Sequence, residues 1–256
     1  MDNTDYAASG DPFTFAVAGD PNRFAAVAWT PAGGKPPKAL LVCVHGLSGA
    51  AGDFEPLAAA LADRGYAVYA ANLRGQGNDP VTERRGDLED VRDWFRDLDA
   101  FVRTVRVRHE DDDPPLYLAG ESMGSLIALS WLTSHAQGSQ VAGLILFVPV
   151  VEFERKIPWW QETLLRLLLR VSPRKRIDFA SLDREGGGEE TSITRDDAYA
   201  AYLDAAPHRI SKFSLRFLKN LADLIDGARA AASRVTVPTL VLSAEHDVFI
   251  EADRIR

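Results

Sequence analysis

The sequence predicts an α/β fold class with a doubly wound, mostly parallel sheet. Three apolar runs of strand length, Ala39–Val44, Tyr66–Ala71 and Val141–Val148, lack the alternation of a strand that has one solvated face. Stretches in which apolar residues recur with helical spacing separate these runs. Ligands of such sheets bind beyond the carboxyl ends of the strands, so the turns that follow the apolar runs are expected to hold the functional site.

The elements around the first buried strand follow from turn and capping signals. Two short β-type runs, Phe13–Val17 and Phe24–Trp29, flank the turn residues 19–22 and predict a hairpin before that strand. After the strand, Asp53 is the expected N-cap of a helix that runs to about Arg64.

A longer helix is predicted after Asp87, its expected N-cap, because apolar residues recur with helical spacing from position 88 to position 105. The acidic, proline-bearing stretch Glu110–Pro115 ends this helix. A buried strand, a sharp turn and another helix are then expected over Leu116–Leu132. The sequence Gly-Glu-Ser-Met-Gly, residues 120–124, occupies the turn.

This G-x-S-x-G motif indicates a nucleophilic serine. A sharp strand-to-helix turn pushes the serine hydroxyl out beyond the sheet, and glycines tolerate the close backbone approach on either side. Serine becomes a nucleophile when a base takes its proton, and acyl transfer needs donors where the carbonyl oxygen becomes negative. Ser122 is therefore the predicted nucleophile. The alternative is a serine that only hydrogen-bonds its own turn.

The alternation of strands and helices fails between about residues 149 and 234, where the pattern is helical. We therefore expect a core at 1–148, a helical cap insertion at 149–234 and a return to the core at 235–256, with a strand over Pro238–Ser243. Gly186-Gly187-Gly188 predicts a mobile loop. The apolar side chains of the cap indicate an acyl-chain tunnel or contact with a lipid surface, or else the cap's own core. The expected substrate contacts among them are Trp159, Trp160 and Leu164.

Composition excludes several classes of protein. A net charge of −8 argues against nucleic acid as a partner, so the basic cluster Arg174-Lys175-Arg176 is interpreted as solvated surface. The sequence has no apolar run of transmembrane length, and Met1–Asp11 is polar, so a cytoplasmic location is expected. Cys43 is expected to be a buried thiol. Without metal-ligand spacing or a dinucleotide fingerprint, no metal and no cofactor are expected.

The order and spacing of these motifs resemble the α/β-hydrolase family, most closely its monoacylglycerol lipase and lysophospholipase-like branch of serine aminopeptidase S33-type hydrolases. The resemblance covers nearly the whole chain from Phe24 onward. Two positions depart from it, because the branch often has histidine in place of Glu121 and usually a second glycine in place of Ser125. The resemblance rests on His45-Gly46, Arg64-Gly65-Tyr66, Leu73-Arg74-Gly75-Gln76-Gly77, the 120–124 motif and Glu245-His246-Asp247.

The resemblance implies a serine hydrolase that cleaves carboxylic esters of amphiphilic lipids, of the monoacylglycerol or lysophospholipid type, through an acyl-enzyme on Ser122. It implies that Asp247, just after the last predicted strand, is the acid that orients a catalytic histidine. The backbone N–H groups of Leu47 and Met123 would form the oxyanion hole. His45 would be a structural residue beside that loop rather than the base. A peptidase of the same fold is the weaker alternative.

The expected catalytic histidine has no obvious place in the sequence. In this fold it follows the acid, yet residues 248–256 contain no histidine. Three explanations stay open: His208 or His246 takes the role, the C-terminal part of the protein is missing from this chain, or the chain is a non-catalytic ligand-binding protein on the same scaffold. A missing C-terminal part would expose apolar surface on the strand around Thr239–Ser243, which predicts self-association.

Overall fold

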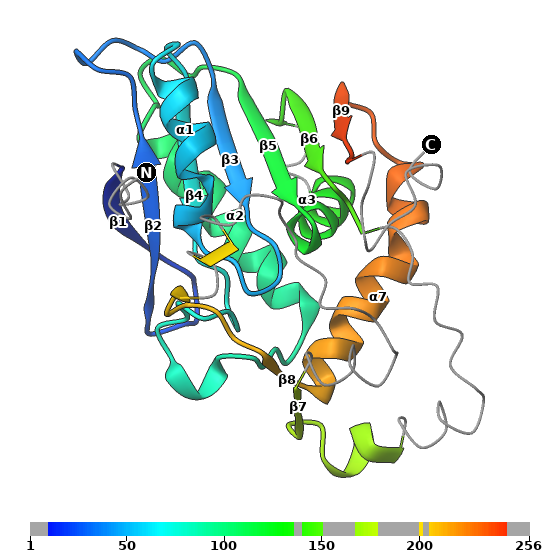
Figure 1. The fold of residues 1–256 in the computed structure, drawn as a ribbon. Helices are drawn as coiled ribbons and strands as arrows, with labels where there is room; N and C mark the ends of the chain where they lie inside the picture. Colours follow the sequence, from blue (N-terminus) through cyan, green and yellow to red (C-terminus); the bar gives the residue numbers. More distant parts are fainter. Residues whose placement is uncertain (1–9, 136–139, 151–166, 179–199, 202–204, 245–256) are drawn as a thin grey trace.

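A computed structural model describes residues 10–135, 140–150, 167–178, 200–201 and 205–244. A seven-stranded sheet forms the centre of the molecule (Figure 1). β2 pairs antiparallel with β1 and β4, whereas all other neighbours are parallel, so the predicted mostly parallel sheet is confirmed. In order across the sheet, the strands are β1 (Asp11–Ala16), β2 (Arg23–Trp29), β4 (Ala67–Ala71), β3 (Leu40–Val44), β5 (Leu116–Glu121), β6 (Gly143–Phe147) and β9 (Thr239–Leu242).

Helices cover both faces of this sheet (Figure 1). The 3₁₀ helix η1 (Ala51–Phe54) and α1 (Glu55–Ala62) pack on one face. The other face carries α2 (Val91–Val107), α3 (Met123–Ser134) and α7 (Leu215–Ala232). A second 3₁₀ helix, η2 (Thr82–Arg84), lies in the connection between β4 and α2.

Burial on both faces explains why the central strands are apolar throughout. Leu40, Val42 and Val44 of β3 join the core cluster that includes α2, α3 and α7, whereas Leu41 and Cys43 pack with α1. All five side chains are buried. The sequence therefore shows no alternation along this strand, and Cys43 is the buried free thiol that was expected.

The predicted cap at Asp53 is wrong. Asp53 lies inside η1, and its carboxylate accepts the N–H of Ala50 at 2.8 Å. α1 begins only after Phe54, which makes no side-chain capping bond. A short 3₁₀ turn therefore precedes the helix, and Asp53 closes that turn instead.

The predicted cap at Asp87 is also wrong. α2 has Asp90 as its N-cap, whose carboxylate accepts the N–H of Arg92 at 2.9 Å. Asp87 instead accepts a hydrogen bond from the Ser214 hydroxyl and another from the Arg216 guanidinium at 2.7 Å. Ser214 is the N-cap of α7, so Asp87 connects the loop before α2 to the start of a helix far along the chain.

Residues 149–234 contain more than the predicted helices. β7 (Arg176–Asp178) and β8 (Lys212–Ser214) form a two-stranded antiparallel sheet. α7 packs against α3, and its buried leucines belong to the main core, so this segment is continuous with the core. The division into core, cap and return stays a prediction. Trp159, Trp160, Leu164 and the glycine run at 186–188 lie outside the described residues.

β9 lies at the edge of the sheet, next to β6. Its Leu240, Val241 and Leu242 are 52%, 42% and 44% exposed. Exposed apolar side chains on an edge strand favour pairing with another chain, so self-association stays a prediction that sedimentation velocity can check.

Candidate active site

Ser122 stands between β5 and α3, in the strand-to-helix turn that the sequence predicts. Its backbone has φ 51° and ψ −117°, a conformation that is strained for a residue with a side chain. The surrounding turn holds it there, because the Ser122 N–H donates to the Phe147 carbonyl at 2.9 Å and the Ser122 carbonyl accepts the Ser125 N–H at 3.0 Å. Such a strained and well-supported serine is the geometry of a nucleophile elbow.

The two glycines of the motif are required by close packing. A Cβ atom at Gly124 would lie 2.0 Å from the Val44 carbonyl oxygen, and one at Gly120 would lie 2.4 Å from the Gly124 carbonyl oxygen. Ser125, where the resemblance led us to expect a glycine, donates its hydroxyl to the Gly120 carbonyl at 2.7 Å. This serine therefore fits the turn and closes it from inside.

The loop after β3 lies beside the nucleophile elbow. β3 and β5 are parallel neighbours with Val44 opposite Gly120, so they end at the same level of the sheet. A Cβ atom at Gly46 would lie 3.2 Å from Ser122 Cβ. The structure thus brings the segment that contains Leu47 to the edge where Ser122 stands. The assignment of the Leu47 and Met123 N–H groups as oxyanion donors stays a proposal.

Ser48 fastens this loop to its surroundings. Its N–H donates to Gln76 Oε1 at 2.9 Å, and its hydroxyl donates to the Ile210 carbonyl. Ser48 has φ 60°, the left-handed conformation that non-glycine residues seldom adopt. Contacts from two distant segments therefore determine the shape of the loop.

His45 is locked in one neutral tautomer. Its Nε2 accepts the N–H of Leu73 at 3.1 Å, so the proton is on Nδ1, which donates to the Gly46 carbonyl at 2.9 Å. Complete burial lowers the pKa of His45 to about 4. With both nitrogens occupied by backbone groups, this histidine supports the loop and does not act as the base for Ser122.

This buried histidine makes stability depend on pH. A histidine whose pKa is lower in the folded state stabilises the fold above its unfolded value of 6.5, and this stabilisation is lost as the pH falls toward about 4. We expect roughly 3 kcal/mol of unfolding free energy to be lost across that interval. Urea unfolding of the wild type and of His45→Asn, which keeps a donor for the Gly46 carbonyl, should show a difference that is largest at neutral pH. A difference independent of pH would contradict this assignment.

Of the other histidines that the structure describes, His109 and His135 contact aromatic side chains, and His208 lies near the loop after β3. His109 Nε2 bonds to the Tyr69 hydroxyl at 2.7 Å, and the His135 ring stacks on Trp131. His208 is buried, and its Nε2 lies 3.6 Å from Asp53 Oδ1 without a hydrogen-bond partner of its own. His208 therefore approaches the loop after β3 from the segment that follows residue 204. His246 and Asp247 lie outside the described residues.

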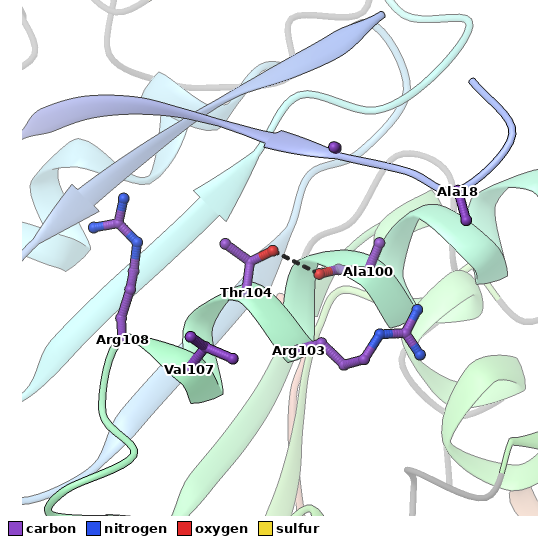
Figure 2. A pocket seen from close by; sticks show the side chains of 7 residues that line it. Ala18, Ala100, Arg103, Thr104, Val107 and Arg108 are labelled. Atoms are coloured by element: carbon purple, nitrogen blue, oxygen red, sulfur yellow. Dashed lines mark hydrogen bonds between the residues drawn. The ribbon is translucent and has the colours of Figure 1, made fainter. Parts of the chain in front are cut away.

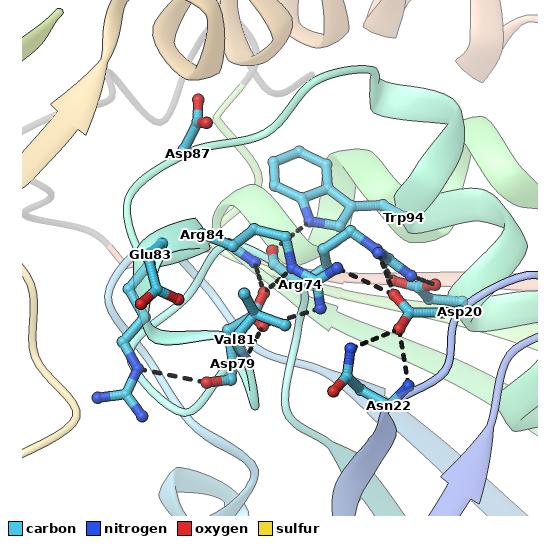
Figure 3. A network of polar contacts seen from close by, with 12 residues as sticks. Asp20, Asn22, Arg74, Asp79, Val81, Glu83, Arg84, Asp87 and Trp94 are labelled. Carbon is cyan, nitrogen blue, oxygen red and sulfur yellow. Dashed lines mark hydrogen bonds and ion pairs between the residues drawn. The ribbon is translucent and has the colours of Figure 1, made fainter. Parts of the chain in front are cut away.

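A buried ionic network supports the loop after β4 (Figure 3). Arg74 binds Asp97 through two nitrogens, at 2.8 and 2.7 Å, and Asp20 through the third, at 2.6 Å. Arg84 bonds to Asp20 at 2.9 Å and to both carboxylate oxygens of Asp79. The two arginines also lie over the ring of Phe24. Because this loop carries Gln76, the network indirectly holds the segment that contains Ser48. The sequence patterns did not predict this ionic network.

A hollow of about 450 Å³ lies between the end of β1 and the second half of α2 (Figure 2). None of its lining residues belongs to the nucleophile elbow or to the loop after β3, so it forms no part of the candidate site. The lining residues are Ala16, Ala18, Ala100, Arg103, Thr104, Val107 and Arg108.

Comparisons with known proteins extend this description. The family described as serine aminopeptidase, S33 matches residues 35–256. Phospholipase YtpA of Bacillus subtilis is 26% identical over 217 residues, which are 84% of this chain and 78% of that protein. Monoglyceride lipase of Saccharomyces cerevisiae is 29% identical over 145 residues, 56% of this chain and 44% of that protein.

Solved structures show the same fold. A soluble variant of monoglyceride lipase from Saccharomyces cerevisiae, in complex with a substrate analogue, has a TM-score of 0.74 at 21% identity and covers 93% of this chain and 77% of its own. Monoacylglycerol lipase of Paleococcus ferrophilus has a TM-score of 0.71 at 20% identity, with 90% and 80% covered. The α/β-hydrolase fold that the motifs implied is thereby confirmed.

Proposed function

Because the chain belongs to the serine aminopeptidase S33 family and has the α/β-hydrolase fold, we propose that it is a serine hydrolase that cleaves carboxylic esters of amphiphilic lipids. The comparisons support a hydrolase of the lipase or esterase type and do not specify its nucleophile or its substrate. The observation that carries the finer proposal is Ser122, held in a strained turn beside the loop after β3.

The proposed reaction passes through an acyl-enzyme. A base takes the Ser122 proton as the oxygen attacks the ester carbonyl, and the N–H groups of Leu47 and Met123 stabilise the negative oxygen of the tetrahedral intermediate. The protonated base then donates to the leaving alcohol. Water repeats the sequence on the acyl-enzyme and releases the fatty acid. Asp247 is the proposed acid, and His208 and His246 are the candidates within this chain for the base that it would orient.

The proposed substrates are monoacylglycerols or lysophospholipids. One relative carries the name phospholipase and others the name monoglyceride lipase, which favours amphiphiles with an acyl ester. The proposed acyl-chain contacts are Trp159, Trp160 and Leu164, whose apolar side chains suit a fatty acyl group.

Contact with a membrane surface is part of the proposal. Leu167 and Val171 are 57% and 74% exposed on a helical segment that also exposes Arg170, and Arg174 follows. Apolar and cationic side chains combined in this way suit an interface with anionic lipid headgroups. In the part of the chain that the structure describes, no helix has the length and apolarity needed to cross a bilayer.

Vesicle sedimentation tests this contact. The double variant Leu167→Asp, Val171→Asp is expected to bind vesicles that contain phosphatidylglycerol at least about tenfold more weakly, because two exposed apolar side chains that would insert into the surface are replaced by charges that the surface repels. Val107→Asp is the matched control, since Val107 is 65% exposed on α2. Equal weakening by both variants would contradict a specific surface at residues 167–171.

The alternative is a protein that binds its ligand without hydrolysing it. It is favoured by one observation, that His45 has both nitrogens occupied by backbone groups. A fluorophosphonate probe separates the two, because it reacts only with an activated serine. Labelling of the wild type, located at Ser122 by peptide mass spectrometry, supports the enzyme. A lack of labelling, together with binding of a non-hydrolysable monoalkyl glycerol ether, would support the alternative.

A further inference from the structure

Glu121 connects the nucleophile elbow to the loop after β3. It is the last residue of β5 and directly precedes Ser122. Its Oε2 accepts the N–H of Gly46 at 2.9 Å, across the two parallel strands. The contact is close, because a Cβ atom at Gly46 would lie 2.8 Å from that oxygen. A side chain at position 46 would therefore displace the Glu121 carboxylate from this contact.

Both polar groups of Gly46 have partners, and this determines where the next N–H points. The Gly46 carbonyl accepts from His45 Nδ1 at 2.9 Å and from the Gly49 N–H at 3.2 Å. In a planar trans peptide the Leu47 N–H points opposite to the Gly46 carbonyl. His45 and Gly49 therefore orient the Leu47 N–H, and Glu121 holds the peptide before it. Removing Glu121 frees one end of this chain of contacts.

The charge of Glu121 is costly in this place. Burial raises the pKa of the Glu121 carboxyl, and the nearby Asp53 raises it further, whereas the Gly46 hydrogen bond and Arg209 lower it. Among the residues that the structure describes, His45 and His208 also lie near Asp53, and neither has a hydrogen bond to the Glu121 carboxylate. A carboxyl whose pKa is raised by folding destabilises the fold at pH values above its unfolded pKa. A costly group retained beside a nucleophile is expected to serve function rather than stability.

We propose that Glu121 is a positioning residue for acylation: its carboxylate holds the Gly46 N–H and so keeps the Leu47 N–H aimed at the developing oxyanion. This role rests on the proposed serine hydrolase function. The negative charge of Glu121 also repels the oxyanion, so two effects oppose one another. Positioning outweighs repulsion in this proposal, because the hydrogen bond is direct and a misaligned oxyanion donor is costly.

Two variants separate these effects, because Glu121→Gln removes the charge and keeps an acceptor of the same size, whereas Glu121→Leu removes the acceptor as well. For Glu121→Leu we expect a roughly tenfold lower rate constant for labelling of Ser122 by a fluorophosphonate, a similar fall in kcat on a short-chain ester and an unchanged KM, whereas Glu121→Gln should keep at least the wild-type rate. The apparent Tm of Glu121→Gln at pH 8 should not fall, since the buried charge is gone and the Gly46 N–H keeps an acceptor. A residue with a purely structural role would lower Tm and leave the rate per folded molecule unchanged. A rate of Glu121→Leu equal to or above that of the wild type would overturn the proposal.

A second measurement does not depend on activity. In protein labelled with ¹⁵N-glycine, the Gly46 amide resonance should shift with pH as Glu121 ionises, at a pH above the usual glutamate range, and this titration should be absent in Glu121→Gln. Glu55→Gln is the matched control, because Glu55 is another buried glutamate. It lies at the start of α1 and accepts a hydrogen bond from Trp29 Nε1. This variant should leave both the labelling rate and the Gly46 titration unchanged.

The outcomes distinguish this proposal from the proposed function. If the wild type is neither labelled nor active, the serine hydrolase proposal fails, and the catalytic role of Glu121 fails with it. If the wild type is labelled but Glu121→Leu is equally fast, only the role of Glu121 fails. A Gly46 amide that does not titrate would overturn the contact itself, whatever the activity.

Discussion

Ser122→Ala is expected to lower kcat for hydrolysis of a monoacylglycerol by on the order of 10⁴-fold or more, because the variant lacks the oxygen that forms the acyl-enzyme. KM should change little, since the proposed acyl-chain contacts are made by other residues. Alanine has the same backbone cost as serine at φ 51°, so the Tm should be close to that of the wild type. Steady-state hydrolysis and a thermal melt measure both quantities.

Ser130→Ala is the matched control for this variant. Ser130 lies in α3, the helix that follows the elbow, and its carbonyl accepts the hydroxyl of Ser134. Loss of its own hydroxyl leaves that contact in place, so activity should be retained. Residual hydrolysis by Ser122→Ala at more than about one percent of the wild-type rate would contradict the nucleophilic role, because triad serines contribute far more than that.

Arg74→Ala is expected to lower the free energy of unfolding by about 3–5 kcal/mol. Arg74 neutralises Asp97 and Asp20, whose side chains are 5% and 9% exposed, so its loss leaves Asp97 without its bidentate cation and Asp20 with Arg84 alone. Trp94 Nε1 also donates to the Arg74 carbonyl at 2.8 Å, a contact through the backbone that the variant can keep. Chemical denaturation at pH 7 measures the change.

Arg103→Ala is the matched control, because it removes the same charge from an exposed position. It shows whether burial of the ion pairs or loss of an arginine charge alone lowers the free energy of unfolding. Arg103 pairs with Asp99 on the surface of α2, where its side chain is 55% exposed, so its removal should change stability by less than about 1 kcal/mol. Equal losses of unfolding free energy from Arg74→Ala and Arg103→Ala would show that the buried network stabilises the fold no more than a surface ion pair does. Because this network supports the loop that holds Ser48 through Gln76, Arg74→Ala should also slow acylation of the folded fraction.

The sheet and the elbow could be predicted because local patterns encode them. Helices cover both faces of β3 and β4, so every residue of these strands is buried and the runs are apolar without alternation. The elbow needs glycine at two positions because any Cβ atom there would meet backbone oxygen atoms. These constraints act on the residues themselves, so a single sequence displays them.

Capping residues were harder to predict, because an aspartate before an apolar run has the same local pattern whether or not it caps the helix. Asp53 closes a 3₁₀ turn, and Asp87 binds Ser214 and Arg216. The latter two residues are more than a hundred positions away from Asp87, so no window of sequence around it contains its partners. Tertiary contacts therefore decided what each carboxylate binds.

The fold class, the family resemblance and the place of Ser122 in a strand-to-helix turn could all be inferred from the residues alone. The folded structure was needed to show that His45 is held neutral by Leu73 and Gly46, and that Glu121 accepts the N–H of Gly46, 75 positions away. Apolar burial and tight turns constrain residue type locally, whereas a hydrogen bond is made with whichever polar group the folded chain brings within about 3 Å.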